Sequence, residues 1–414
     1  MNKRLLFSVA AASTAAVATA GVMDREKGLK IGERLTLLPS VSFSYTYDSN
    51  VDSSKHSRSG SQWSVNPGLH TIYLGDEWKL DFDIYYTYHA YSRYTSQLDS
   101  STYGERLRFD WADSAPDEAG WRVLFSEKFD QISQDDDMSN HDGRGIGRDR
   151  KQLTVEGVIE RRLNSRLHAD VNASYYYLDY DNNVKKYAPM YGWKRTLVGG
   201  EAGYMASKWT DLLVAANYMW IDQDNDRNYG GHLSEARGKH IGSKSDGWTV
   251  MGGVATRATE KLAYKLMGGY SRFEYGDGVK DLGGFVYQAN ADWQMDADNT
   301  LHMMLVAASY YQPSEREYGS AIKVYNVSYG LGKGFIRNKL RGTLDLSYRK
   351  ETHEYSEFRE DDYDVDVWTG RVGLSYVINR FLSVYARLEY QNQDADNRYD
   401  YDRWRGTVGF MLSY

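Results

Sequence analysis

The sequence predicts an all-β fold, a transmembrane up-and-down antiparallel β-barrel of about 18 strands, with roughly 16 to 20 as the range. Three observations lead to this prediction. Polar and apolar residues alternate along one segment after another, short turns alternate with long polar loops, and aromatic residues gather at the ends of the apolar faces. Each of these is expected of a barrel whose outer face meets lipid and whose inner face meets water.

Composition argues against several other classes of protein. The chain has 414 residues with 36 Tyr, 38 Gly, 5 Pro and no Cys, and its formal net charge is -7. Without cysteine it has no disulfide, no thiolate zinc ligand and no cysteine nucleophile. Its dispersed, slightly acidic charge argues against a nucleic-acid partner, which requires a basic face. Beyond the N-terminus no stretch reaches the ~18 apolar residues that a spanning helix needs.

Residues 1–20 are predicted to be a signal peptide. Lys3 and Arg4 precede a run of apolar and small residues, and Ala18-Thr19-Ala20 gives the small-x-small pattern of a cleavage site. We therefore expect export through a cleaved N-terminal signal peptide to the outer membrane of a Gram-negative envelope. Residues 21–37 are then expected to be a short periplasmic segment, and residues 38–414 the barrel.

The strands are predicted from a period of two residues. Leu382, Val384 and Ala386 fall on one face of a segment, whereas Ser383, Tyr385 and Arg387 fall on the other. We expect such segments at 38–49, 61–74, 77–92, 101–112, 120–133, 150–163, 166–180, 193–206, 210–222, 246–257, 261–275, 284–295, 300–312, 320–334, 339–352, 364–378, 380–392 and 402–414.

A soluble barrel, sandwich or propeller is the alternative architecture, with its apolar faces turned inward. Strands of 10 to 14 residues are long for a soluble sheet but match a tilted membrane crossing. An interfacial belt requires aromatic residues at the ends of the lipid-facing strand faces. Those expected in the belt are Tyr45, Tyr47, Tyr86, Tyr88, Tyr175, Tyr177, Tyr218, Trp220, Tyr348 and Tyr390. These features favour the membrane barrel.

The C-terminal residues predict one partner. Thr407, Gly409, Leu412 and Tyr414 read as polar-x-Gly-x-x-apolar-x-aromatic. This pattern is similar to the C-terminal signal that the barrel assembly machinery of bacterial outer membranes recognises, and an ordinary last strand can also produce it. Gly409, Leu412 and Tyr414 are therefore the candidate assembly signal.

The first strands carry a resemblance to a known family. Pro39 to Val51 reads PSVSFSYTYDSNV, and Trp63 to Leu69 reads WSVNPGL. Together they resemble the start of the putative β-barrel porin type 2 family, which is related to barrels of exopolysaccharide export systems. The likeness at motif level covers about residues 38–90. It implies an outer-membrane pore and says little about what passes through.

If the apolar faces meet lipid, the alternate positions line a lumen. Charges at this density are too costly for a dry core, so we expect water inside. The basic pore-lining candidates are Lys79, Arg106, Arg108, Arg122, Arg195, Lys265, Arg341, Arg349, Arg371, Arg387, Arg403 and Arg405. The acidic candidates are Asp81, Asp83, Asp110, Glu156, Asp170, Asp345 and Glu389. The arginines near the C-terminus either form a positive ring that favours anions or pair with neighbouring carboxylates.

The predicted function is passive diffusion of small hydrophilic solutes through a porin-like channel. The alternatives are an accessory barrel in exopolysaccharide secretion or surface assembly, and a surface adhesin that acts through its long loops. We expect no enzyme, no cofactor and no metal site, because no GxSxG motif occurs and the nine histidines are scattered. The expected partners are outer-membrane lipid, the barrel assembly machinery and small solutes. The sequence leaves the oligomeric state open, and also whether loop 134–149 folds into the lumen.

Overall fold

The computed structural model describes residues 28–51, 58–92, 99–113, 119–133, 149–180, 192–223, 244–275, 281–296, 300–313, 321–336, 339–354, 363–395 and 400–414. Across these ranges the regular structure is entirely β, in one sheet of 19 strands. None of the described residues belongs to a helix of the length and apolarity needed to span a membrane.

The first strand, β1, is short, and the other eighteen make a closed antiparallel barrel. The strands are β1 (Leu29–Ile31), β2 (Leu35–Asp48), β3 (Gly60–Leu74), β4 (Trp78–Tyr91), β5 (Ser100–Ala112), β6 (Gly120–Ser133), β7 (Arg150–Arg162), β8 (Leu167–Tyr180), β9 (Trp193–Ser207), β10 (Thr210–Gln223), β11 (Lys244–Thr256), β12 (Leu262–Tyr275), β13 (Leu282–Gln294), β14 (Leu301–Pro313), β15 (Ala321–Phe335), β16 (Leu340–Glu354), β17 (Tyr363–Val377), β18 (Leu382–Ala395) and β19 (Tyr401–Ser413).

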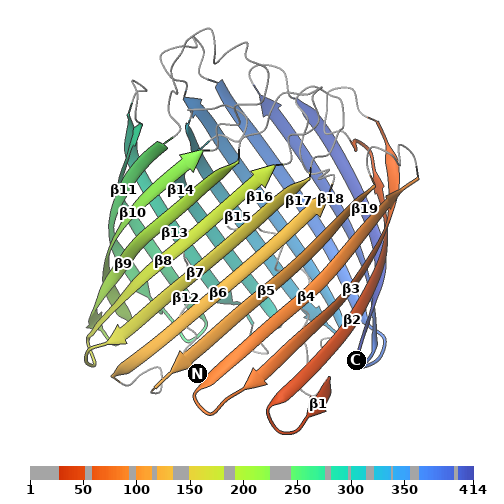
Figure 1. The fold of residues 1–414 in the computed structure, drawn as a ribbon, viewed down its shortest axis with the longest axis horizontal. Helices are drawn as coiled ribbons and strands as arrows, with labels where there is room; N and C mark the ends of the chain where they lie inside the picture. The colour runs from red at the N-terminus through yellow and green to blue at the C-terminus, as the bar shows by residue number, and fades with distance from the viewer. Residues whose placement is uncertain are drawn as a thin grey trace.

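Each barrel strand pairs with the next one along the chain, and β19 pairs with β2 to close the wall. Gly409 lies opposite Ser44 in this seam. The prediction of an up-and-down antiparallel barrel is confirmed. The barrel strands are tilted in Figure 1, and β1 and the end of β19 lie near the same rim. The described short turns lie at this rim, and the strand ends that longer stretches of sequence separate lie at the opposite one.

The outer face of the barrel is apolar and exposed. Val171, Val214 and Phe285 show 60%, 60% and 63% of their surface, which is unusual for large apolar side chains in a water-soluble protein. Near the rim with the longer loops, aromatic side chains pack across neighbouring strands. Their ring centroids are 4.7 Å apart in the pair of Tyr45 and Trp63. This arrangement fits a hydrocarbon-facing band bounded by aromatic residues.

Short polar side chains form turns at the rim where β19 ends. Asn164 Oδ1 accepts hydrogen bonds from the backbone N–H groups of Arg166 and Leu167 at 2.8 and 2.9 Å. Asn379 Oδ1 accepts bonds from Phe381 and Leu382 at 2.8 and 3.0 Å. Such Asx turns satisfy backbone donors locally, which explains how a few residues connect two long strands.

Two details differ from the sequence prediction. The barrel begins at Leu35 rather than at residue 38, and β1 folds back on β2 with Leu29 opposite Leu37. The inner face is also not polar throughout. Leu213, Met251 and Met267 lie on it and are buried in an apolar cluster, because β10 to β12 carry apolar residues on both faces there.

The exposed apolar band predicts that the effect of a new charge in β8 on stability depends strongly on the face that carries it. Val171→Arg places a guanidinium on the outer face and should lower the free energy of unfolding by about 2–4 kcal/mol, as for arginine near a bilayer midplane. Asn172→Arg, one residue along on the inner face, should cost far less. Urea unfolding of the barrel in lipid vesicles measures both, and equal losses would contradict this assignment of faces.

A turn carboxylate predicts a dependence of stability on pH. Asp296, between β13 and β14, accepts hydrogen bonds from Thr300 Oγ1 and from the Leu301 N–H at 3.0 Å, and Lys333 Nζ donates to it at 2.9 Å. These donors hold the pKa of Asp296 well below its usual range. The contribution of the Asp296 carboxylate to stability is therefore complete above the pKa of the unfolded state, about 4, and is progressively lost as the pH falls below that value.

Asp296→Asn should accordingly lower the thermal midpoint at pH 7, and the difference from the parent chain should shrink as the pH is lowered to 3. Asp76→Asn is the matched control, because that turn carboxylate has one exposed partner, Arg34 at 2.8 Å. Thermal melts at both pH values provide the measurement. A difference that stays constant with pH would contradict the role of the Asp296 carboxylate.

Candidate functional site

The register places every charged pore-lining candidate on the face opposite the exposed apolar residues, which is the inner face of the closed barrel. In β16, for example, Leu346 is 47% exposed on the outside, whereas Asp345 lies on the inside opposite Arg371 of β17. The candidates on the inner face are Lys79, Arg106, Arg108, Arg122, Arg195, Lys265, Arg341, Arg349, Arg371, Arg387, Arg403, Arg405, Asp81, Asp83, Asp110, Glu156, Asp170, Asp345 and Glu389. That they line a conducting pore stays a prediction.

Along β4 to β12, many of these charges meet partners within the wall. Lys79 Nζ lies 2.6 Å from Asp81, and Arg122 Nη2 lies 2.7 Å from Asp110. Such pairs are half-buried, so each charge is compensated without a loss of contact with water. This part of the inner face combines high charge density with little net charge.

Some ion pairs join strands that are not neighbours in the sheet. Lys265 on β12 reaches Glu201 on β9, with Nζ and Oε2 2.6 Å apart. Two intervening strands, β10 and β11, pass beneath this ion pair. The inner side chains therefore brace the curvature of the wall as well as line it.

Inner-face aromatic side chains also pack within the wall. The Tyr85 hydroxyl donates to Asp130, and the Tyr176 and Trp193 rings lie 4.4 Å apart. Arg195 lies over the ring of Trp193, at 5.7 Å from its centroid. These contacts favour a structural role for such rings over stacking on a solute.

On the inner face, the sector formed by β16 to β19 carries more basic than acidic residues. Arg403 donates to Asp48 at 2.8 Å, in a pair that is buried on both sides. Arg405 lies 3.2 Å from Glu389. Glu389 also accepts a hydrogen bond from Arg371. One carboxylate thus serves two guanidinium groups, and the sector keeps an excess of positive charge.

The arginines of β16 to β19 divide into those that pair with carboxylates and those that do not, and whether they favour anions stays a prediction. Arg371, Arg403 and Arg405 pair with carboxylates. Within the part of the chain that the structure describes, Arg341 and Arg387 form no ion pair within 4 Å. Both still interact electrostatically with Asp345.

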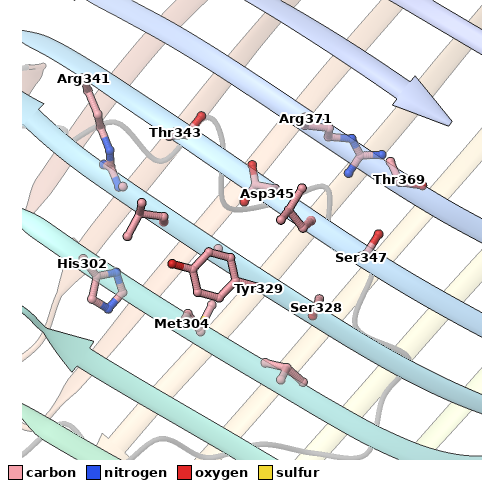
Figure 2. Close-up of a pocket in the computed structure, with 15 residues that line it drawn as sticks. His302, Met304, Ser328, Tyr329, Arg341, Thr343, Asp345, Ser347, Thr369 and Arg371 are labelled. Carbon is pink, nitrogen blue, oxygen red and sulfur yellow. The ribbon is translucent and has the colours of Figure 1, made fainter.

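Beside these arginines the inner wall holds a depression. It is lined by inner-face side chains of β14, β16 and β17, with Gly330 and Gly332 of β15 at its floor. Figure 2 shows Arg341, Asp345 and Arg371 around it, together with the hydroxyls of Thr343 and Ser347. The combination of guanidinium groups, one carboxylate and several hydroxyls suits a hydrated polar solute.

Glycine residues leave the room for this depression. A Cβ at Gly332 would lie 3.2 Å from Arg341 Nη2, and a Cβ at Gly330 would lie 3.3 Å from Asp345 Oδ1. At Gly373 it would lie 2.7 Å from Thr343 Oγ1. The charged and hydroxyl side chains of β16 therefore lie over a floor that larger residues would fill.

At the end of the depression nearer the short turns, His302 and Asp292 form a further pair, with Nε2 and Oδ1 2.8 Å apart. Among the described residues there is no group of three His, Asp or Glu side chains that could hold a metal ion. The loop 134–149 falls, apart from Asp149, outside the described residues, so the question of whether it folds into the lumen stays open.

Sequence reasoning missed several inner-face residues. Asp48 lies at the end of β2, where it resembles a turn residue, although alternation along the strand would have placed it inside. Lys128, Asp130 and Glu201 follow the same alternation on β6 and β9. The apolar cluster had no comparable signal, because a segment that is apolar on both faces does not identify its inner side.

The candidate assembly signal lies in the closing seam. Gly409 allows a close approach, since a Cβ there would lie 2.6 Å from the Phe43 carbonyl oxygen. Tyr414 is exposed and stacks on Phe381, with ring centroids 5.7 Å apart. Leu412 is exposed on the same outer face. Recognition of these residues by the assembly machinery stays a prediction.

Solved structures of outer-membrane barrels resemble this fold. The outer membrane protein OpdK of Pseudomonas aeruginosa is 10% identical with a TM-score of 0.44, over 91% of this chain and 99% of its own. OccAB4 of Acinetobacter baumannii is 11% identical with a TM-score of 0.42, over 93% of this chain and 100% of its own. The siderophore receptor PirA of Pseudomonas aeruginosa is 11% identical with a TM-score of 0.43, over 91% of this chain and 80% of its own. At these identities no residue role is transferred.

No curated protein matches the sequence. A family model does, and it is the family that the first strands resemble. The matched residues run from the end of β10 to the C-terminus and therefore complement the N-terminal motif at residues 38–90. Over residues 223–414 the chain matches the family described as "Putative beta-barrel porin 2", and its fold is that of an outer-membrane β-barrel.

Proposed function

We propose that this chain is a porin-like channel for the passive diffusion of small hydrophilic solutes across the outer membrane. The observation that carries the proposal is the division between the two faces of the barrel strands. Exposed apolar side chains cover the outside, whereas charged and hydroxyl side chains cover much of the inside. The match to a porin family supports the same function.

The width of the barrel allows such a path. Barrels of eight strands are filled by their own side chains, whereas porins of about 16 to 18 strands leave an aqueous channel. This barrel has eighteen strands. Its inner charges stay inexpensive only where water reaches them, because an unpaired ion in a dry interior costs several kcal/mol.

Export and insertion complete the proposal. The signal peptide at residues 1–20 would deliver the chain to the periplasm, and the last strand would present Gly409, Leu412 and Tyr414 to the barrel assembly machinery. The outer band would then contact lipid. The arrangement needs no cofactor and no catalytic residue, because diffusion through a fixed lumen requires neither.

Purified, folded protein added to planar bilayers should produce stepwise conductance increases that grow with salt concentration. Vesicles carrying the protein should swell in small sugars and not in large ones, because solutes enter through a lumen of fixed width. Heat-denatured protein at the same concentration is the control. A folded barrel that gives neither conductance steps nor swelling would contradict the channel.

A further inference from the structure

The inner face of β16 to β19 holds two guanidinium groups that no described carboxylate occupies. Arg371 is held by Glu389, and Arg403 is held by Asp48. Arg341 and Arg387 have no such bond in the described residues, and both lie near Asp345. Asp345 thus faces these two positive charges as well as Arg371, which lies opposite it, and the surroundings keep an excess of positive charge.

The arrangement of the strands keeps these donors accessible. Arg387 lies opposite Gly373, and Gly373 lies opposite Thr343. Because Gly373 has no side chain, Thr343 Oγ1 lies over it, 2.7 Å from the position that a Cβ would take. Arg341 lies over Gly332 in the same way, with Nη2 3.2 Å from the position of a Cβ. Arg341 thus lines the depression, and Arg387 lies beside it on β18, two strands from the lining residue Thr343.

Hydroxyl groups complete the surroundings of the two arginines. Thr343, Ser347 and Thr369 line the depression, together with Ser328 on β15. Guanidinium groups bind carboxylates with paired, charge-assisted hydrogen bonds, and hydroxyl side chains both donate and accept. A ligand that uses all of these groups carries one carboxylate and several hydroxyls.

We propose that this depression and the neighbouring Arg387, together called the Arg341–Arg387 site, bind small solutes that carry a single carboxylate together with hydroxyl groups, such as a uronic acid. The proposal rests on the proposed channel and specifies its solute class. One carboxylate reduces the positive excess, and the hydroxyls of the sugar replace water at the serine and threonine side chains. The Asp345 carboxylate offsets part of the positive charge and keeps the attraction weak enough for the solute to leave.

The test measures binding and transport separately. Isothermal titration calorimetry of the detergent-folded barrel uses D-glucuronate as the probe and D-glucose as its neutral counterpart. Single-channel recording in planar bilayers then shows whether glucuronate interrupts the current. The parent chain should bind glucuronate saturably and glucose far more weakly, and only glucuronate should interrupt the current.

The variant R341Q/R387Q should weaken glucuronate binding about tenfold or more, because charge-assisted donors are lost. R106Q/R108Q is the matched control. It removes two guanidinium groups that also lack an ion pair in the described residues, from β5 on another part of the wall. This control should keep glucuronate binding. Asp345→Asn should tighten binding, because it raises the positive excess by one charge.

Three results would overturn the site: no glucuronate binding by the parent chain, equal binding of glucose, or the same loss in both double variants. Each of them leaves the channel intact if conductance persists. Conversely, glucuronate binding that follows the predicted order of variants, in a barrel without conductance, would uphold the site and contradict the proposed channel.

Discussion

In hydrocarbon a backbone N–H or C=O group finds no water, so each one must bond to another strand. This constraint explains why the chain continues through eighteen antiparallel pairings and ends where β19 meets β2. Gly409 permits the close approach at that seam, and the buried pair of Arg403 and Asp48 joins the same two strands on the inside. Closure fixes an inside and an outside, and the residue period of two then distributes side chains between them.

The inner face is divided into sectors with different chemistry. Pairs such as Arg122 with Asp110 neutralise one another along β4 to β9. An apolar cluster around Met251 and Phe273 covers part of β10 to β13. The basic sector of β16 to β19 follows. A solute in such a lumen meets a strong transverse difference in polarity, so its orientation, as well as its size, bears on its passage.

Much of this architecture follows from sequence alone, because alternation is a local property. Alternation predicts the strands and the face of each residue, so adjacent residues such as Asp345 and Leu346 are assigned to opposite faces. Partners cannot be predicted in this way. Opposite neighbours such as Arg371 and Glu389 depend on the register of two strands, and Lys265 with Glu201 depends on the curvature of four. The role of Gly330 and Gly332 likewise cannot be predicted from the sequence, because the side chains that lie over them come from the neighbouring strand β16.

The most direct measurement of the assignment of faces uses single cysteines, since the chain has none of its own. Ser347→Cys places a thiol on the inner face of β16, and Leu346→Cys places one on the outer face. Each channel is recorded in a planar bilayer while a charged, membrane-impermeant methanethiosulfonate is added. The account predicts a stepwise change of current for the position 347 variant and none for the position 346 variant. Modification of position 346 alone, or of both positions alike, would contradict it.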